Sequence, residues 1–182
     1  MSDSLPSSCR PFKPFSFTVL SFLTLVFFTG SSFSVVSGPA SREANEELMQ
    51  LRTDITGYAQ NFLGLRYRHG GTSPDRGGFD CSGFTSYILK EFDVKVSSSS
   101  RTQAAQGEKI PLDEVLPGDL VFFGRKGYVH HVAMVVDNSD EGIVCVHSTC
   151  SRGIIVENIS NSAYWRPKIL FARDVISGQM TK

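Results

Sequence analysis

The sequence predicts an α+β domain in which an antiparallel sheet packs on a helix that begins at a cysteine. Two helical patterns come first along the 182-residue chain, and a series of short apolar runs separated by tight turns follows them. This order is typical of α+β domains with an antiparallel sheet. The proportions of hydrophobic (41%) and charged (20%) residues suit a single globular domain.

The charge of the chain argues against nucleic acid as a partner. The sequence holds 18 basic and 18 acidic residues, and its formal net charge is zero. It contains no run of basic residues and no basic stripe, which are the usual signatures of nucleic-acid binding. We therefore expect no nucleic-acid partner.

Residues 1–41 have the composition of a targeting segment. Arg10 and Lys13 precede an uncharged, mostly apolar run over residues 15–30, and small residues follow it. The run is shorter than the roughly 20 apolar residues that a membrane-spanning helix needs. We predict a cleaved secretory signal, with an uncleaved membrane anchor as the alternative, and a linker over residues 37–41.

Either form of this segment predicts that residues 42–182, the folded domain, lie outside the cytoplasm. The domain would then be periplasmic, bound to the cell envelope or secreted. No cysteine directly follows the apolar run, so the lipid attachment site of bacterial lipoproteins is not indicated. The oligomeric state is not determined by the sequence, and a monomer is the expectation.

Two helices are predicted ahead of the strands. Over residues 42–63, apolar residues recur at three- and four-residue spacing, and Gly64 follows as a suitable helix end. The second helix is predicted to begin at Cys81, because Asp80 is a good N-cap and apolar residues follow at four-residue steps. Between the helices, residues 70–78 are rich in glycine and are predicted as a loop.

The strands are predicted from apolar runs bounded by turn residues. A polar loop and a short helix over residues 101–106 lead from the second helix to the first run. Residues 138–142 form a hairpin turn between the second and third runs. The predicted strands are residues 120–123, 129–136, 143–147, 154–158 and 169–173.

Cys81 is the main candidate for chemistry. In the first turn of a helix, backbone N–H groups and the helix dipole stabilise a thiolate, and the pKa of cysteine falls to roughly 3.5–7.5 at such sites. The same N–H groups can hold an oxyanion. A buried structural cysteine is the alternative, but the polar neighbours Asp80 and Ser82 are unusual in a core. The pattern indicates a cysteine hydrolase.

Two neighbouring histidines compete for the role of base. His130 and His131 lie in one predicted strand and point to opposite faces, so only one can meet Cys81. Ala133 shares a face with His131, and its small side chain would leave room for a packed helix terminus. This favours His131, but the residues alone leave the choice open.

His147 ends the next predicted strand. If the two strands pair through the turn at residues 138–142, His147 lies beside His131 and can orient that imidazole by a hydrogen bond. A surface histidine at a strand end is the alternative. A zinc site that includes Cys145 and Cys150 lacks a fourth ligand at matching spacing. We therefore expect no metal and no cofactor.

Cys145 and Cys150 allow two interpretations. A disulfide between them would close a very short loop, which strains its geometry. The other interpretation is a pair of small buried residues.

The motifs together resemble the NlpC-type family of bacterial cell-wall cysteine peptidases, a compact branch of the papain-like enzymes. The resemblance covers about residues 55–173 and depends on five ordered motifs. These lie at residues 67–71, 79–84, 117–123, 131–133 and 147–148, with Gln103 between the second and the third.

The resemblance implies a papain-like fold, with N-terminal helices and the nucleophile helix packed on a sheet of five or six antiparallel strands. It also implies a set of catalytic roles. Cys81 would be the nucleophile, His131 the general base and His147 the residue that orients it, which decides between His130 and His131. Tyr67 would help the Cys81 amide to hold the oxyanion.

The resemblance further implies the substrate and the residues that meet it. The family cuts peptide stems of peptidoglycan, between D-glutamate and the diamino acid or at the cross-link between stems. Asp80 and Ser82 would line the cleft that binds the stem. The sequence departs from the family in two respects: it shows no SH3-like or LysM wall-binding module, and His69 stands where an aromatic residue often precedes the glycine pair.

Two other functions stay open at this point. One is an amidase or acyltransferase of the same fold that acts on a non-wall amide or lipid. The other is an inactive wall-binding domain, which would have no need of Cys81, His131 and His147 together.

Overall fold

The computed structural model describes residues 39–180. The predicted signal or membrane anchor lies outside these residues. The linker prediction is wrong for residues 39–41, because the first helix begins at Pro39. Between residues 39 and 180, no helix combines the length and the apolar character needed to cross a membrane.

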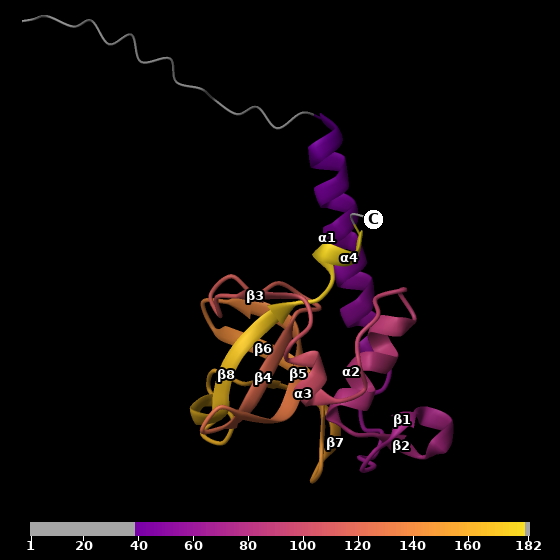
Figure 1. The fold of residues 1–182 in the computed structure, drawn as a ribbon, viewed down its shortest axis with the longest axis vertical. Helices are drawn as coiled ribbons and strands as arrows, with labels where there is room; N and C mark the ends of the chain where they lie inside the picture. Colours follow the sequence, from indigo (N-terminus) through magenta and orange to yellow (C-terminus); the bar gives the residue numbers. More distant parts are fainter. Residues whose placement is uncertain (1–38, 181–182) are drawn as a thin grey trace, which may run out of the picture. The chain divides into compact units, whose positions relative to one another are not determined.

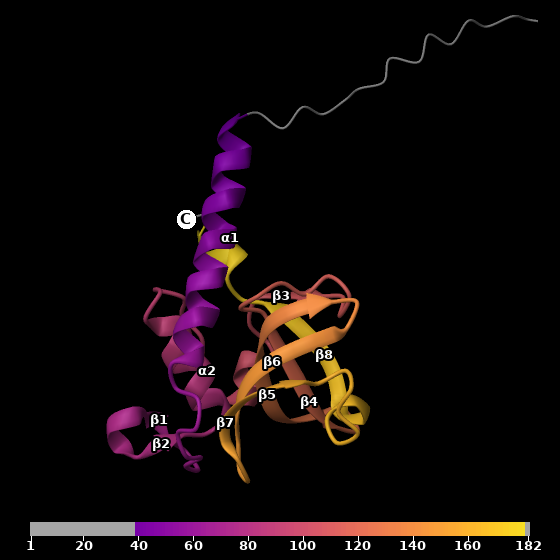
Figure 2. The same cartoon turned by 180° about the vertical axis from the view of Figure 1, so that it is seen from behind.

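Two helices pack together beside the sheet (Figures 1 and 2). The first, α1 (Pro39–Gln60), ends three residues before the predicted boundary, and Gly64 then turns the chain with a φ of 84°. The second, α2 (Cys81–Lys90), starts at the predicted residue, with Asp80 as its N-cap. The N-terminal end of α1 extends beyond the rest of the fold (Figure 1), and residues 40–47 are exposed.

The large sheet has six antiparallel strands in the order β3-β8-β4-β5-β6-β7. Five of them coincide with the predicted runs and are slightly longer. They are β4 (Leu120–Arg125), β5 (Tyr128–Ser139), β6 (Gly142–Thr149), β7 (Gly153–Asn158) and β8 (Ile169–Asp174). The α+β class, with the helix of Cys81 packed on an antiparallel sheet, is confirmed.

Several short elements were not predicted. The edge strand β3 (Glu108–Ile110) has two charged residues and no apolar run. The glycine-rich loop contains a small hairpin, β1 (Thr72–Ser73) and β2 (Gly78–Phe79), around the 3₁₀ turn η1 (Pro74–Arg76). The predicted short helix is α3 (Ser100–Gln103), and the remaining elements are η2 (Arg166–Lys168) and α4 (Ser177–Met180).

Both faces of the sheet are apolar and covered. On one face, Val132 and Met134 of β5 pack in a core with Phe84 and Ile88 of α2. On the other face, alternate residues form a second core, which the segments before β4 and after β7 cover: Val121, Phe123, Ala133, Val135, Cys145 and Ile159. The strands therefore appear in the sequence as continuous apolar runs rather than as alternating ones.

A buried ion pair ties α1 to the sheet. The guanidinium of Arg52 is fully buried and donates to Asp119 Oδ1, at the start of β4, over 2.7 Å. It also contacts Asp174 Oδ2, at the end of β8, over 2.9 Å. Pro117 and Ser177 accept two further hydrogen bonds from it. The Arg52 side chain thus joins α1 to the start of β4 and to the end of its neighbouring strand β8.

Candidate active site

Asp80 and three glycines hold the first turn of α2 in place. Asp80 Oδ1 accepts the backbone N–H of Gly83 over 2.7 Å, and its Oδ2 accepts that of Gly70 over 3.0 Å. A Cβ on Gly83 would lie 1.9 Å from the carbonyl oxygen of Gly71. The close approach therefore requires glycine at residue 83, and it fixes the glycine-rich loop against the turn that carries Cys81.

Cys81 is largely covered and lies against strand β5. The backbone amide of Val132 donates to its thiol, and the amides of Ser82 and Cys81 itself contribute in the same sense. Burial nevertheless raises the pKa of Cys81 above its ordinary value, and the nearby Asp80 adds to this rise. The expectation of a lowered thiol pKa is therefore wrong for the uncomplexed site, because desolvation outweighs the helix N-terminus. Cys81 is a neutral thiol that needs a base.

His131 and His147 are brought together. His131 Nε2 lies 2.9 Å from His147 Nδ1, and the ring of Trp165 stacks on His131 with centroids 4.5 Å apart. Burial, with a smaller contribution from His147, lowers the pKa of His131 to about 3. His130, on the other face of the strand, is exposed.

The structure pairs His131 with His147, but the small side chain of Ala133 is not a valid reason for preferring His131 over His130. Ala133 lies in the core on the far side of the sheet from α2, so it leaves no room for the helix. The helix packs instead on the face of Val132 and Met134, and Cys81 meets the strand at the Val132 amide.

His147 is fully buried and has a second partner that the sequence did not reveal. Its Nε2 lies 2.9 Å from Glu157 Oε1 on the neighbouring strand β7. Glu157 is the cross-strand partner of Cys145, two residues before His147, so the two side chains are diagonal neighbours on one face of the sheet. Had the register of the hairpin between β6 and β7 been predicted, it would have placed Glu157 beside His147. Trp165, which stacks on His131, lies in a loop, where no periodic pattern predicts its position.

Tyr67 lies at the edge of the site. Its hydroxyl is hydrogen-bonded to the thiol of Cys150, and Cys81 and Asp80 are close enough to act on it electrostatically. Burial is the main cause that raises the pKa of Tyr67, with Cys150 next, and the pKa reaches about 12. The phenol is therefore protonated and can donate a hydrogen bond.

Asp80 and Ser82 both have partners within the protein. The Ser82 hydroxyl is buried, donates to the carbonyl of Ser98 over 2.8 Å and lies 3.2 Å from Asp80 Oδ1. The buried amide of Gln103 donates to the Ser82 carbonyl over 3.1 Å. These contacts hold the turn before Cys81 and the loop at residues 97–100 in place.

Cys145 and Cys150 are both free thiols. Cys145 is a buried core residue, as one of the two interpretations had it, and burial raises its pKa. Cys150 is exposed, because it lies in the turn after β6 rather than in the strand. The disulfide interpretation does not hold for this pair.

Two adjoining hollows open beside His131. Both are bordered by His131, Cys150, Tyr164 and Trp165. One extends over Phe123 to the side chains of Arg125 and Lys168, and the other extends to Arg152 and Ser162. Aromatic rings and positive charges therefore flank the imidazole on its open side.

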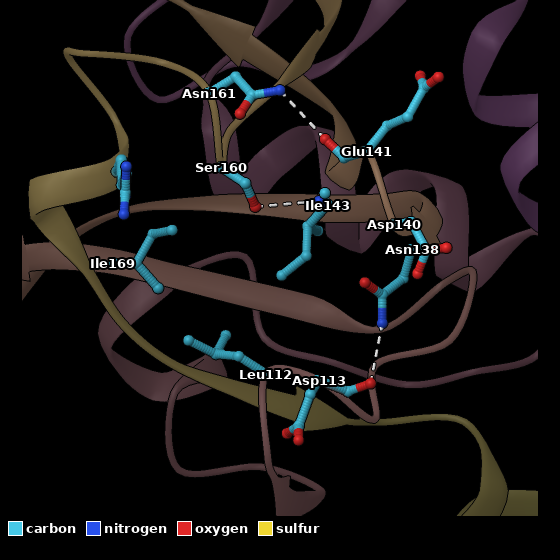
Figure 3. A pocket seen from close by; sticks show the side chains of 11 residues that line it. Leu112, Asp113, Asn138, Asp140, Glu141, Ile143, Ser160, Asn161 and Ile169 are labelled. Carbon is cyan, nitrogen blue, oxygen red and sulfur yellow. Dashed lines mark hydrogen bonds between the residues drawn. The ribbon is translucent and has the colours of Figure 1, made fainter.

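A third hollow, drawn in Figure 3, lies at the turn between β5 and β6 and contains none of the predicted site residues. Hydrogen bonds cross it from Asn138 to the carbonyl of Asp113 and from Asn161 to that of Glu141. The Ser160 hydroxyl accepts the N–H of Ile143. Its polar groups serve to tie surface loops together.

Comparison with known families gives the wider setting of this site. Residues 64–174 match the model of the NlpC/P60 family, and this span contains Cys81, His131 and His147. The chain belongs to the NlpC/P60 family. The resemblance to NlpC-type cysteine peptidases is thereby confirmed. The matched span begins after α1.

Individual relatives agree with this assignment. The gamma-DL-glutamyl hydrolase of Bacillus subtilis is 31% identical over 131 residues, which are 70% of this chain and 30% of that protein. The probable endopeptidase NlpC of Escherichia coli is 30% identical over 158 residues, 84% of this chain and 96% of that protein. The chain thus spans less than a third of the first relative and nearly all of the second.

A solved structure has the same fold. The NlpC/P60 domain of the peptidoglycan hydrolase SagA is 27% identical and superposes with a TM-score of 0.57, covering 68% of this chain and 97% of that domain. The papain-like α+β architecture of the NlpC/P60 family is therefore that of this chain.

Proposed function

We propose that the chain is a cysteine endopeptidase that hydrolyses amide bonds in the peptide stems of peptidoglycan. The observation that carries the proposal is the 2.9 Å contact between His131 Nε2 and His147 Nδ1. His131 lies on β5, the strand whose Val132 amide bonds to the thiol of Cys81. A thiol, an imidazole base and a group that orients the base are the parts of a nucleophilic hydrolase.

The reaction begins with transfer of the Cys81 proton to His131. Because burial raises the pKa of Cys81, the thiol is neutral before substrate arrives and depends on a general base. Burial also keeps His131 neutral, as a proton acceptor must be. With Nε2 engaged by His147, the ring nitrogen that takes the proton is Nδ1.

The thiolate then attacks the carbonyl carbon of the amide, and a C–S bond forms as the carbonyl oxygen becomes an oxyanion. The backbone N–H groups at the start of α2 hold this oxyanion, together with the protonated phenol of Tyr67. His131 gives its proton to the leaving amine as the C–N bond breaks. Water, deprotonated by His131, hydrolyses the thioester and releases Cys81.

The hollows beside His131 support a substrate that carries carboxylates. Arg125 and Lys168 place two positive charges at the edge of a pocket whose floor is aromatic. Stem peptides of peptidoglycan offer carboxylates from D-glutamate and from the diamino acid, and the relative from Bacillus subtilis is named for a glutamyl bond. The proposed bond is that between D-glutamate and the diamino acid, or the cross-link between stems.

Asp80 and Ser82 are proposed to line the cleft that binds the stem, because they fix the first turn of α2 beside Cys81. Their polar atoms already have protein partners, so they would shape the cleft more than bind the peptide. Such a substrate implies an extracytoplasmic location, which agrees with the targeting segment predicted for residues 1–41.

The test is product analysis with defined substrates. The purified protein is incubated with peptidoglycan, with short stem peptides and with an acylated amide that lacks D-glutamate, and products are identified by mass spectrometry. The expected result is cleavage of the stems at one bond next to D-glutamate or at the cross-link. Cleavage of the non-wall amide alone would replace the proposal with an amidase or acyltransferase.

A further inference from the structure

The carboxylate of Glu157 contacts three polar side chains beside the histidine pair. Its Oε1 lies 2.9 Å from His147 Nε2, and it accepts from the indole N–H of Trp165 over 2.7 Å and from Arg152 over 2.8 Å. Arg152 also reaches Oε2 over 2.8 Å. Glu157, on β7, thus contacts one group from the paired strand β6, one from the turn between β6 and β7, and one from the loop after β7.

The contacts require that Glu157 be ionised. Burial acts to raise the pKa of Glu157, but the hydrogen bonds from Arg152, Trp165 and His147 outweigh it and hold the pKa below its ordinary value. An ionised carboxylate can only accept hydrogen bonds. His147 must therefore carry a proton on Nε2, the nitrogen that faces Glu157.

We propose that Glu157 is a positioning residue that sets the tautomers of both histidines and so leaves the correct nitrogen of His131 to act as the base. The proposal rests on the proposed function and extends it. A neutral His147 with its proton on Nε2 has a lone pair on Nδ1, so His131 must donate its own Nε2 proton there. The lone pair of His131 then lies on Nδ1, where a thiol proton can be accepted.

Burial of His147, with a smaller contribution from Arg152, keeps this chain of hydrogen bonds from reversing. Glu157 alone would favour a protonated His147, and an imidazolium would donate from Nδ1 toward His131. Burial and the positive charge of Arg152 act against that state, and the pKa of His147 lies below its ordinary value. The positive charge of Arg152 offsets the negative charge of Glu157. The carboxylate can therefore accept a hydrogen bond from His147 without stabilising a second proton on that imidazole.

Trp165 links the same carboxylate to the ring of His131. Its indole N–H bonds to Glu157 Oε1 while its ring stacks on His131 with an interplanar angle of 21°. Glu157 thus fixes the plane of the base through Trp165 and its tautomer through His147.

The direct test is the tautomer of each histidine, measured by NMR on the purified protein labelled with ¹⁵N-histidine. The four histidine signals are assigned with single His→Gln variants. In the wild type, His131 and His147 are both expected to carry the proton on Nε2 and none on Nδ1. In Glu157→Leu, which removes the acceptor, the proton of His147 is expected to redistribute between its two nitrogens. An unchanged pattern in this variant, or a wild-type His147 protonated on Nδ1, would overturn the proposal.

Reactivity of Cys81 gives a second readout that needs no substrate. At neutral pH, alkylation of Cys81 by iodoacetamide is expected to slow by about 100-fold in Glu157→Leu and by about tenfold in Glu157→Gln, which keeps an acceptor oxygen. Glu108→Gln, which removes an exposed carboxylate on β3, is the matched control and should alkylate at the wild-type rate. Where hydrolysis is measured, kcat should fall in the same order and KM should change little.

The variants also separate positioning from mere packing. Arg152→Leu removes a larger side chain from the same cluster but leaves Glu157 bonded to His147 and Trp165. Burial, the main cause that keeps His147 neutral, also remains, so the tautomers should stay as in the wild type. Equal loss of Cys81 reactivity in Arg152→Leu and Glu157→Leu, with unchanged tautomers in both, would show a structural role only. Because both readouts use the free protein, failure to cleave stem peptides would reject the proposed function without deciding this proposal.

Discussion

Replacement of Arg52 by methionine tests how the first helix is bound to the rest of the fold. Arg52 is fully buried, and its guanidinium balances Asp119, which is itself 1% exposed. Burial raises the pKa of Asp119 to about 6, although the Leu116 amide and Arg52 act in the opposite direction. Without Arg52 the carboxyl group is left buried and unpaired, a change that costs about 3–5 kcal/mol in comparable sites.

The magnitude can be measured by urea unfolding at neutral pH. For a slope of roughly 2 kcal/mol per molar urea, the loss corresponds to a midpoint lower by about 1.5–2.5 M. Arg42→Met is the matched control, since Arg42 lies on the same helix, is 82% exposed and pairs only with Glu46 among the described side chains. That control should cost at most about 0.5 kcal/mol.

A double variant sharpens the test. In Arg52→Met with Asp119→Leu, no unpaired charge remains at the start of β4, so the domain should regain part of the lost stability. A loss below about 1 kcal/mol in Arg52→Met, or a double variant no better than the single one, would refute the view that this ion pair holds α1 in place.

Three further outcomes follow from the site. His131→Ala should lower kcat/KM by about 10²–10⁴-fold in stem-peptide hydrolysis, whereas His130→Ala should stay near wild type; the reverse ranking would show that the wrong histidine was chosen. Arg125→Met and Lys168→Met should each raise KM roughly three- to tenfold with kcat nearly unchanged, and an unaltered KM would remove the carboxylate subsite. Because burial lowers the pKa of His131 to about 3 and also lowers that of His147, the unfolded chain binds more protons than the native one between about pH 6.5 and pH 3. The free energy of unfolding should therefore fall as the pH is lowered through this range, and His131→Asn should flatten the dependence; an identical slope in this variant would contradict the assignment.

Local patterns in the sequence were sufficient to predict most of the fold. The start of α2 followed from Asp80, whose side chain caps the helix as expected. The strands followed from apolar runs between turns, and β6 and β7 differ from prediction by two residues or fewer at each end. The edge strand β3 was missed because Glu108 and Lys109 have no strand pattern, and only pairing with β8 makes them extended.

What depends on packing across the fold could not be predicted. The raised pKa of Cys81 results from how deeply α2 packs against β5, which a helix N-terminus alone does not reveal. Glu157 looks like an ordinary exposed strand residue until the register of β7 places it diagonal to His147. Trp165 reaches His131 from a loop, so no periodicity in the sequence could pair them.

The measurement that tests the central claim most directly is peptidoglycan digestion by the wild type and by two cysteine variants, with products read by mass spectrometry. Cys81→Ala should release no fragments above background, because the nucleophile is lost. Cys145→Ala, which alters a buried cysteine outside the proposed mechanism, should release the same fragments as the wild type. Fragments from a folded Cys81→Ala protein would contradict the account.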